Sequence, residues 1–259
     1  MRIIQDQTEA LGTFAADLIA ERVADRPDAV IGLATGSSPL PIYAELAKRV
    51  AAGALDLSAA RFFALDEYVG LAGDHPMSYR AFLDEHVIAA CGLDPAQLRV
   101  LDGKATDLHA ECIDYERAIR DAGGVDLQIL GIGHNGHIAF NEPTTSFASR
   151  TRVVALTQQT VDANARFFDD DVEDVPLLAL SQGIGTILEA RRLVLIATGL
   201  GKAPAIHSSI EGELTSSVPG SALQLHPKVT FLVDSAAGSM LERGEFYRRE
   251  RDLIPGYGH

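Results

Sequence analysis

An apolar run of the chain leads into a glycine-rich loop that holds two histidines, two asparagines and a glutamate. These polar residues are His134, Asn135, His137, Asn141 and Glu142. Glycine lets a backbone approach a ligand closely, and a strand before the loop would hold the side chains on a rigid base. An imidazole five residues from a carboxylate suits proton transfer near neutral pH. The loop therefore predicts acid–base chemistry.

The same loop has two other interpretations. The glycine pattern of residues 131–136 matches the dinucleotide-binding fingerprint, but that fingerprint needs a following helix, and Pro143 leaves no room for one. His134 and His137 have a spacing that metal ligands can have, yet no third His or Cys lies nearby in the sequence. We expect neither a cofactor nor a metal centre.

A second segment has the composition of an anion-binding turn. Thr35, Gly36, Ser37 and Ser38 lie between a predicted strand and a predicted helix. Their N–H groups and hydroxyls can point at an anion that also meets the positive end of the helix dipole. Alternatively, Ser37 or Ser38 simply caps the helix, and the sequence leaves both interpretations open.

Two cations and one carboxylate complete the set of candidates. Lys202 follows a glycine-rich turn that lacks the spacing of a nucleotide-binding loop, which favours a simple phosphate ester over ATP. Arg166 by itself would be read as an ordinary surface arginine. Its aromatic neighbours, however, indicate a helix that folds over another part of the structure. Asp66 follows a predicted strand and is a candidate general base, although paired acids such as Asp66 and Glu67 are more often merely solvated.

Composition limits the classes of protein that fit. A formal charge of −14 argues against a nucleic-acid partner, because such binding depends on clustered Lys and Arg. No apolar run approaches the roughly 20 residues that span a bilayer, and no secretory signal is evident, so we expect no membrane partner. With two scattered cysteines, Cys91 and Cys112, these features predict a cytoplasmic protein. The sequence leaves a homo-oligomer open.

Strand-like and helix-like segments alternate along the chain, as is typical of parallel βαβ units. We therefore expect an α/β fold: one domain over residues 1–259, with an open, doubly wound, mainly parallel sheet covered by helices on both faces (Rossmann-like). The expected strands are 29–34, 61–65, 98–101, 125–130, 153–156, 193–197 and 229–233. The first expected helix begins after an N-cap at Thr8. Further helices are expected near 43–52, 107–122, 178–189 and 202–210.

Four motifs of the chain resemble those of the glucosamine-6-phosphate deaminase family, and the resemblance covers nearly the whole chain. They are Asp66-Glu-Tyr-Val-Gly-Leu71, Gly131-Ile-Gly-His-Asn-Gly-His-Ile-Ala-Phe-Asn-Glu-Pro143, Ala163-Asn-Ala-Arg-Phe-Phe168 and Leu223-Gln-Leu-His-Pro-Lys228. The resemblance implies conversion of glucosamine 6-phosphate, a small-molecule sugar phosphate, to fructose 6-phosphate and ammonia without a cofactor. The galactosamine epimer stays open as a substrate.

The resemblance also implies a role for each candidate residue. Asp66 would move a proton from C2 to C1 of the opened sugar, and His137 would assist ring opening. Glu142 and Asn135 would position and tune His137. The 6-phosphate would be bound by Thr35, Gly36, Ser37, Ser38, Arg166 and Lys202.

Two positions depart from the family pattern. Some members have Asp where this chain has Asn135, and Val154 stands where members activated by N-acetylglucosamine 6-phosphate have a second cation near Arg152.

Two other functions compete with that of a deaminase. A 6-phosphogluconolactonase has a similar fold but has no need of a base such as Asp66. A sugar-phosphate sensor of a transcription regulator would need a DNA-binding segment, for which this chain has no basic helix-turn-helix.

Overall fold

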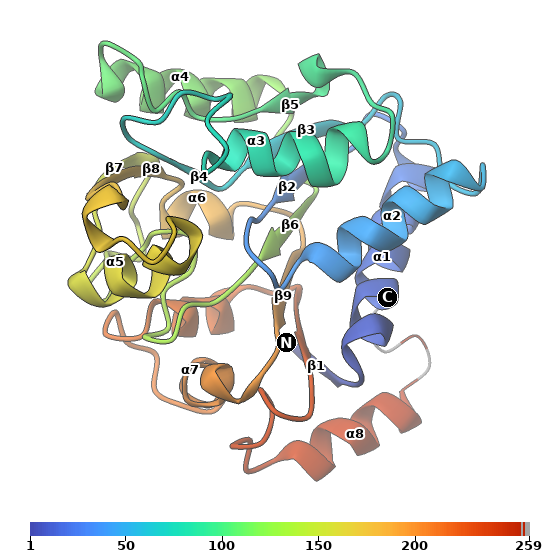
Figure 1. The fold of residues 1–259 in the computed structure, drawn as a ribbon. Helices are drawn as coiled ribbons and strands as arrows, with labels where there is room; N and C mark the ends of the chain where they lie inside the picture. The colour runs from blue at the N-terminus through green and yellow to red at the C-terminus, as the bar shows by residue number, and fades with distance from the viewer. Residues whose placement is uncertain (255, 257–259) are drawn as a thin grey trace.

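A seven-stranded parallel sheet forms the centre of the computed structural model, which describes residues 1–254 and 256 (Figure 1). Its strands, in order across the sheet, are β1 (Arg2–Gln5), β10 (Val229–Val233), β9 (Leu193–Ala197), β6 (Leu127–Leu130), β2 (Val30–Leu33), β3 (Arg61–Ala64) and β5 (Leu98–Arg99). Every neighbouring pair in this sheet is parallel. The expected α/β fold class, with an open and mainly parallel sheet, is confirmed.

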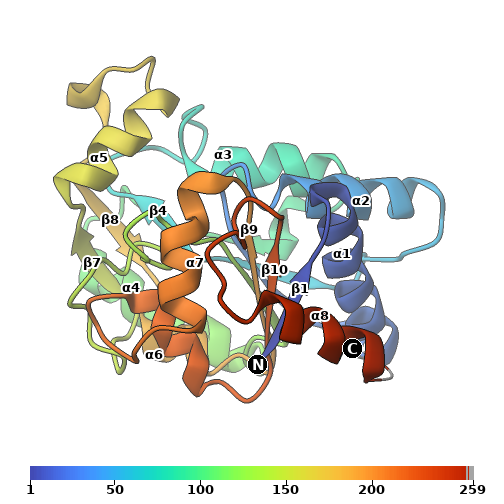
Figure 2. The same cartoon turned by 90° about the horizontal axis from the view of Figure 1, so that it is seen from below.

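Helices lie on both sides of this sheet (Figures 1 and 2). The α-helices of the described residues are α1 (Thr8–Asp25), α2 (Leu40–Ala51), α3 (Tyr79–Leu83), α4 (Leu108–Asp121), α5 (Gln158–Asn164), α6 (Ile184–Leu188), α7 (Ala203–Ile210) and α8 (Gly244–Leu253). No helix in residues 1–254 is long and apolar enough to cross a membrane. Residues 255 and 257–259 of the expected 1–259 domain lie outside the described residues.

The order of the strands creates a switch point between β2 and β6. From β2 the chain proceeds outward to β3 and β5, then returns to β6 on the other side of β2 and continues to β9 and β10. The loops that follow β2 and β6 therefore leave the same edge of the sheet in opposite directions. A crevice opens where two such loops separate, and ligands of doubly wound proteins bind there.

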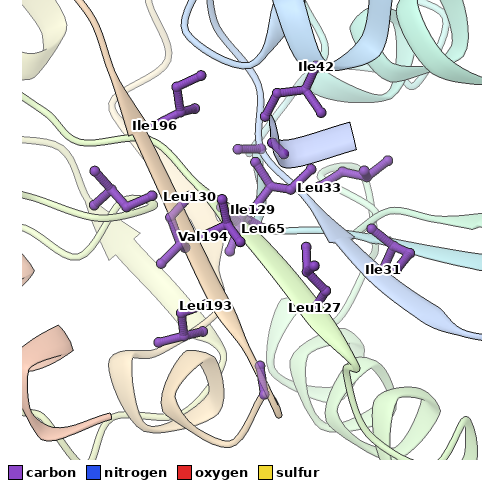
Figure 3. Close-up of a cluster of buried hydrophobic side chains, with 14 of the residues drawn as sticks. Ile31, Leu33, Ile42, Leu65, Leu127, Ile129, Leu130, Leu193, Val194 and Ile196 are labelled. Atoms are coloured by element: carbon purple, nitrogen blue, oxygen red, sulfur yellow. The ribbon is translucent and has the colours of Figure 1, made fainter. Parts of the chain in front are cut away.

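Both faces of the middle strands are buried. Every residue of β2, β6, β9 and β10 is buried, which explains why these strands appear in the sequence as continuous apolar runs. In Figure 3, Ile31 and Leu33 of β2 lie near Leu127 and Ile129 of β6. Each such side chain contributes roughly 1.5–3 kcal/mol on burial, so the sheet is a rigid support for the loops at its edge.

A second, smaller sheet was not expected. It joins β4 (Asp66–Tyr68), β8 (Leu178–Ser181) and β7 (Arg152–Ala155) in antiparallel pairs. The prediction of a helix over 178–189 is therefore wrong in its first half, and only α6 within it is helical. Pairing with β4 and β7 determines the conformation of Leu178–Ser181, and tertiary pairing of this kind overrides local helix propensity.

Two smaller expectations also need correction. Thr8 is the first residue of α1 rather than its N-cap, and Gln7 occupies the cap position without a side-chain hydrogen bond. Strand 153–156 was expected to extend the main sheet, but it belongs to the small one as β7. The edge strand β1 and the C-terminal helix α8 were not predicted, since β1 is short and the surface of α8 is mostly charged.

Candidate active site

A cavity of about 520 Å³ lies at the switch point between β2 and β6. Loops that follow β2, β3, β6 and β9 line it, together with residues of α5 and the 3₁₀ turn η3 (Ala165–Phe167) that follows α5. The candidates that line the cavity are Thr35, Gly36, Ser37, Ser38, Asp66, Asn135, His137, Arg166 and Lys202. Glu142 is the exception, because it is buried behind His137.

The turn after β2 forms one end of the cavity. Gly36 has φ of +95°, a backbone conformation that favours glycine, and a Cβ there would meet nothing within 4 Å. Pro39 occupies the N-cap of α2, and this helix has no side-chain cap in the described structure. Ser37 and Ser38 therefore do not act as helix caps, and both residues line the cavity.

Two cations from separate loops lie near each other at the cavity wall, in a region that we call the cationic end. Lys202 ends the 3₁₀ turn η5 (Leu200–Lys202) after β9, and Arg166 comes from η3 with its guanidinium 4.7 Å from the centre of the Phe167 ring. Burial and the charge of Arg166 lower the pKa of Lys202 to about 8. In a chain of net charge −14, this pair is a local concentration of positive charge that could attract an anion.

The loop after β9 is fixed by a carboxylate at the end of β10. Gly199 has φ of +87°, and its N–H donates to both carboxylate oxygens of Asp234, at 3.1 and 2.9 Å. The N–H of Ala237 donates to the same carboxylate at 2.7 Å. Asp234 thus holds the turn that presents Lys202, a function that the sequence alone did not indicate.

Asp66 is buried at the point where the chain passes from β3 into β4. Burial, and then the charge of Glu67, raise the pKa of Asp66 well above its usual value. Its neighbour Glu67 has a structural role, since its carboxylate accepts the backbone N–H groups of Tyr79 and Arg80 at the start of α3. Only Asp66 of this acidic pair lines the cavity, and a raised pKa suits a base that works near neutral pH.

The loop after β6 places His137 against Glu142. The two approach at 3.6 Å between Nδ1 and Oε2, and the buried Nδ1 has no hydrogen-bond partner among the described residues. Asn135 Nδ2 donates to the same Oε2 at 2.7 Å, while Asn135 Oδ1 accepts the backbone N–H of His137 at 3.1 Å. Asn135 therefore contacts the main chain of His137 rather than its ring.

The charge of Glu142 is strongly stabilised. Burial alone would raise its pKa, but His137, Thr160 and Asn135 together lower it to about 2. The imidazole can lie close to the backbone because residue 133 is glycine, where a Cβ would come within 2.2 Å of the ring. The result is an ionised carboxylate that faces an imidazole at the cavity wall, an arrangement that can orient a proton shuttle.

Several residues at the cavity were not assigned to the sugar-phosphate site from the sequence. His134 lies against Gly201, and the charge of Lys202 is the main cause of its lowered pKa, so it belongs to the cationic end. The Tyr68 hydroxyl accepts from Asn164 Nδ2 at 2.8 Å, which connects α5 with the strand that begins at Asp66. The sequence placed His134 on the glycine-rich loop but gave it no role in anion binding. Asn164 gave no signal, because its contact depends on how α5 packs.

Comparison with known proteins places this geometry in a family. A family model described as glucosamine-6-phosphate isomerases/6-phosphogluconolactonase matches residues 4–231. The chain belongs to this family. Glucosamine-6-phosphate deaminase of Mycolicibacterium smegmatis is 52% identical over 255 residues, which cover 98% of each chain. The deaminase of Streptomyces coelicolor is 50% identical over 246 residues, which cover 95% of this chain and 94% of that protein.

Solved structures of the family agree with the fold. A monomeric glucosamine-6-phosphate deaminase superposes with a TM-score of 0.90 at 41% identity. The match covers 93% of this chain and 100% of that chain. A 6-phosphogluconolactonase from Trypanosoma cruzi superposes with a TM-score of 0.74 at 20% identity, covering 93% and 97%. The second likeness concerns the fold alone, so the two activities of the family must be distinguished at the site.

Proposed function

We propose that the chain is a glucosamine-6-phosphate deaminase, which converts glucosamine 6-phosphate and water into fructose 6-phosphate and ammonia. The observation that carries the proposal is the buried carboxylate of Asp66 at the cavity wall, separate from the His137–Glu142 pair. Ring opening and enolisation need two independent acid–base groups, whereas hydrolysis of a lactone needs no carboxylate for enolisation. Relatives named as deaminases are about half identical over almost the entire chain.

The cationic end would hold the substrate by its 6-phosphate. Lys202 and Arg166 would supply charge, and the turn of Thr35, Gly36, Ser37 and Ser38 would supply N–H and hydroxyl donors. A phosphate fixed there leaves the sugar ring to extend along the cavity between Asp66 and His137. Binding energy from this remote group then positions the reacting carbons.

Ring opening would come first, with His137 as the proton shuttle and Glu142 and Asn135 as the groups that orient it. Opening moves a proton from the C1 hydroxyl to the ring oxygen and leaves an aldehyde at C1. Asp66 would then remove the proton from C2 and deliver it to C1, while a proton passes from the amine to the C1 oxygen. These transfers convert the 2-amino aldehyde into a 2-imine with a hydroxyl at C1. Water adds to the imine carbon, and ammonia leaves. Each step is a proton transfer or an addition of water, so these side chains suffice without a cofactor.

Product analysis tests the proposal. The purified protein is incubated in parallel with glucosamine 6-phosphate, galactosamine 6-phosphate and 6-phosphogluconolactone, and ammonia, ketose phosphate and acid are measured. We expect ammonia and fructose 6-phosphate in equal amounts from the first substrate. Acid from the lactone without ammonia from either amino sugar would favour the lactonase function instead.

We also propose that the reaction takes place in the cytoplasm. The two cysteines, which are free and buried, support this location.

A further inference from the structure

Thr160 connects helix α5 to the ring-opening pair. Its side chain is buried, and its hydroxyl donates to Oε1 of Glu142. The same hydroxyl accepts from the hydroxyl of Thr157 at 3.1 Å, and Thr157 in turn accepts the N–H of Thr160 at 3.3 Å as the cap of α5. An ionised carboxylate can only accept, so the single proton of the Thr160 hydroxyl must point at Glu142.

The two oxygens of Glu142 are therefore held from different parts of the chain. Oε1 is held by Thr160 of α5, and Oε2 is held by Asn135 at 2.7 Å within the loop after β6. Oε2 is also the oxygen that faces Nδ1 of His137 at 3.6 Å. A carboxylate rotates as a unit, so the contact at Oε1 determines how Oε2 is presented to the imidazole.

Helix α5 contacts the other two parts of the site as well. Asn164 donates to the hydroxyl of Tyr68 at 2.8 Å, two residues beyond Asp66, and the following turn carries Arg166 to the cationic end. Figures 1 and 2 both show α5 beside β7 and β8, on the opposite side of the molecule from α1 and α2. A hydroxyl at position 160 thus makes the alignment of the ring-opening pair depend on the placement of α5.

We propose that Thr160 is a positioning residue for ring opening, whose hydroxyl holds the Glu142 carboxylate in the orientation that His137 requires. The inference rests on the proposed deaminase function. Thr160→Val keeps the shape of the side chain and removes the hydroxyl, so kcat should fall about ten- to a hundredfold, the range for a lost hydrogen bond to a charged group. KM should change less than about twofold, because the change removes no group assigned to the phosphate. Thr160→Ser keeps the hydroxyl and should retain most of the activity.

A double-mutant cycle with Glu142→Ala separates positioning from a general structural effect. If Thr160 acts through Glu142, adding Thr160→Val to Glu142→Ala should lower kcat less than about twofold further. An equal loss in both backgrounds, or an unchanged kcat in Thr160→Val alone, overturns the inference. If Thr160→Val does not fold, Thr160→Ala takes its place in the same cycle. A wild-type protein that releases no ammonia from glucosamine 6-phosphate instead overturns the proposed function, and the assigned role with it.

Discussion

The lowered pKa of Lys202 predicts that sugar-phosphate binding weakens in alkaline solution. Burial and Arg166 place this pKa at about 8. If only the protonated lysine binds the phosphate, the apparent Kd rises by the factor 1 + 10^(pH − pKa), which is about 1.1 at pH 7 and about 11 at pH 9. Affinity should therefore fall about tenfold between these two values. In Lys202→Arg the cation stays protonated throughout, and the pH dependence should disappear.

Calorimetric titration with fructose 6-phosphate measures this effect cleanly. The ligand has no amine, and its phosphate has a second pKa near about 6, so its charge is nearly constant from pH 7 to 9. The pKa of His134 is lowered, chiefly by the charge of Lys202, so His134 titrates further from this window than an ordinary histidine does. The slope of affinity against pH is the quantity compared, so a loss of absolute affinity in Lys202→Arg does not matter. A flat profile in the wild type, or a tenfold fall that persists in Lys202→Arg, would refute this account of the anion site.

Three further predictions concern catalysis and regulation. Asp66→Asn should lower kcat by about 10²- to 10⁴-fold, the usual contribution of a general base. Fructose 6-phosphate should still bind within about twofold of the wild-type affinity. Near-normal turnover would exclude Asp66 as the base. Burial and the charge of Glu67 raise the pKa of Asp66, and the base must be ionised to act. As pH falls, kcat/KM should therefore decline at a pH above the usual pKa range of aspartate. A profile of kcat/KM against pH locates this decline. With Val154 in place of a second cation, saturation should be near hyperbolic, and N-acetylglucosamine 6-phosphate should not activate; a Hill coefficient above one that collapses with this compound would contradict the prediction.

The main sheet could be predicted from the sequence because its central strands are continuous apolar runs between helical segments. Strands β9 and β10 begin and end where the sequence predicts. The small sheet could not be predicted, since Asp66 pairs with Ser181 across a long stretch of chain, and no local pattern encodes such a pairing. Short strands of this kind take their conformation from their partners.

The candidate site could be predicted only where its residues lie on glycine-rich loops at strand ends. The loops that carry Gly36 and His137 meet because β2 and β6 are neighbours, which follows from a doubly wound sheet. Thr160 and Asn164 reach the site from a helix, and only the packing of α5 shows that they do. The sequence therefore indicates the reacting groups better than the groups that position them.

The fate of the hydrogen at C2 tests the central claim most directly. Glucosamine 6-phosphate that carries deuterium at C2 is converted by the wild-type enzyme, and the products are examined by NMR together with released ammonia. If Asp66 transfers a proton between C2 and C1, all product is fructose 6-phosphate, and the label is found at C1 or in the solvent, with one ammonia per sugar. A product that keeps deuterium at C2, as direct displacement of the amine by water would give, would contradict the account.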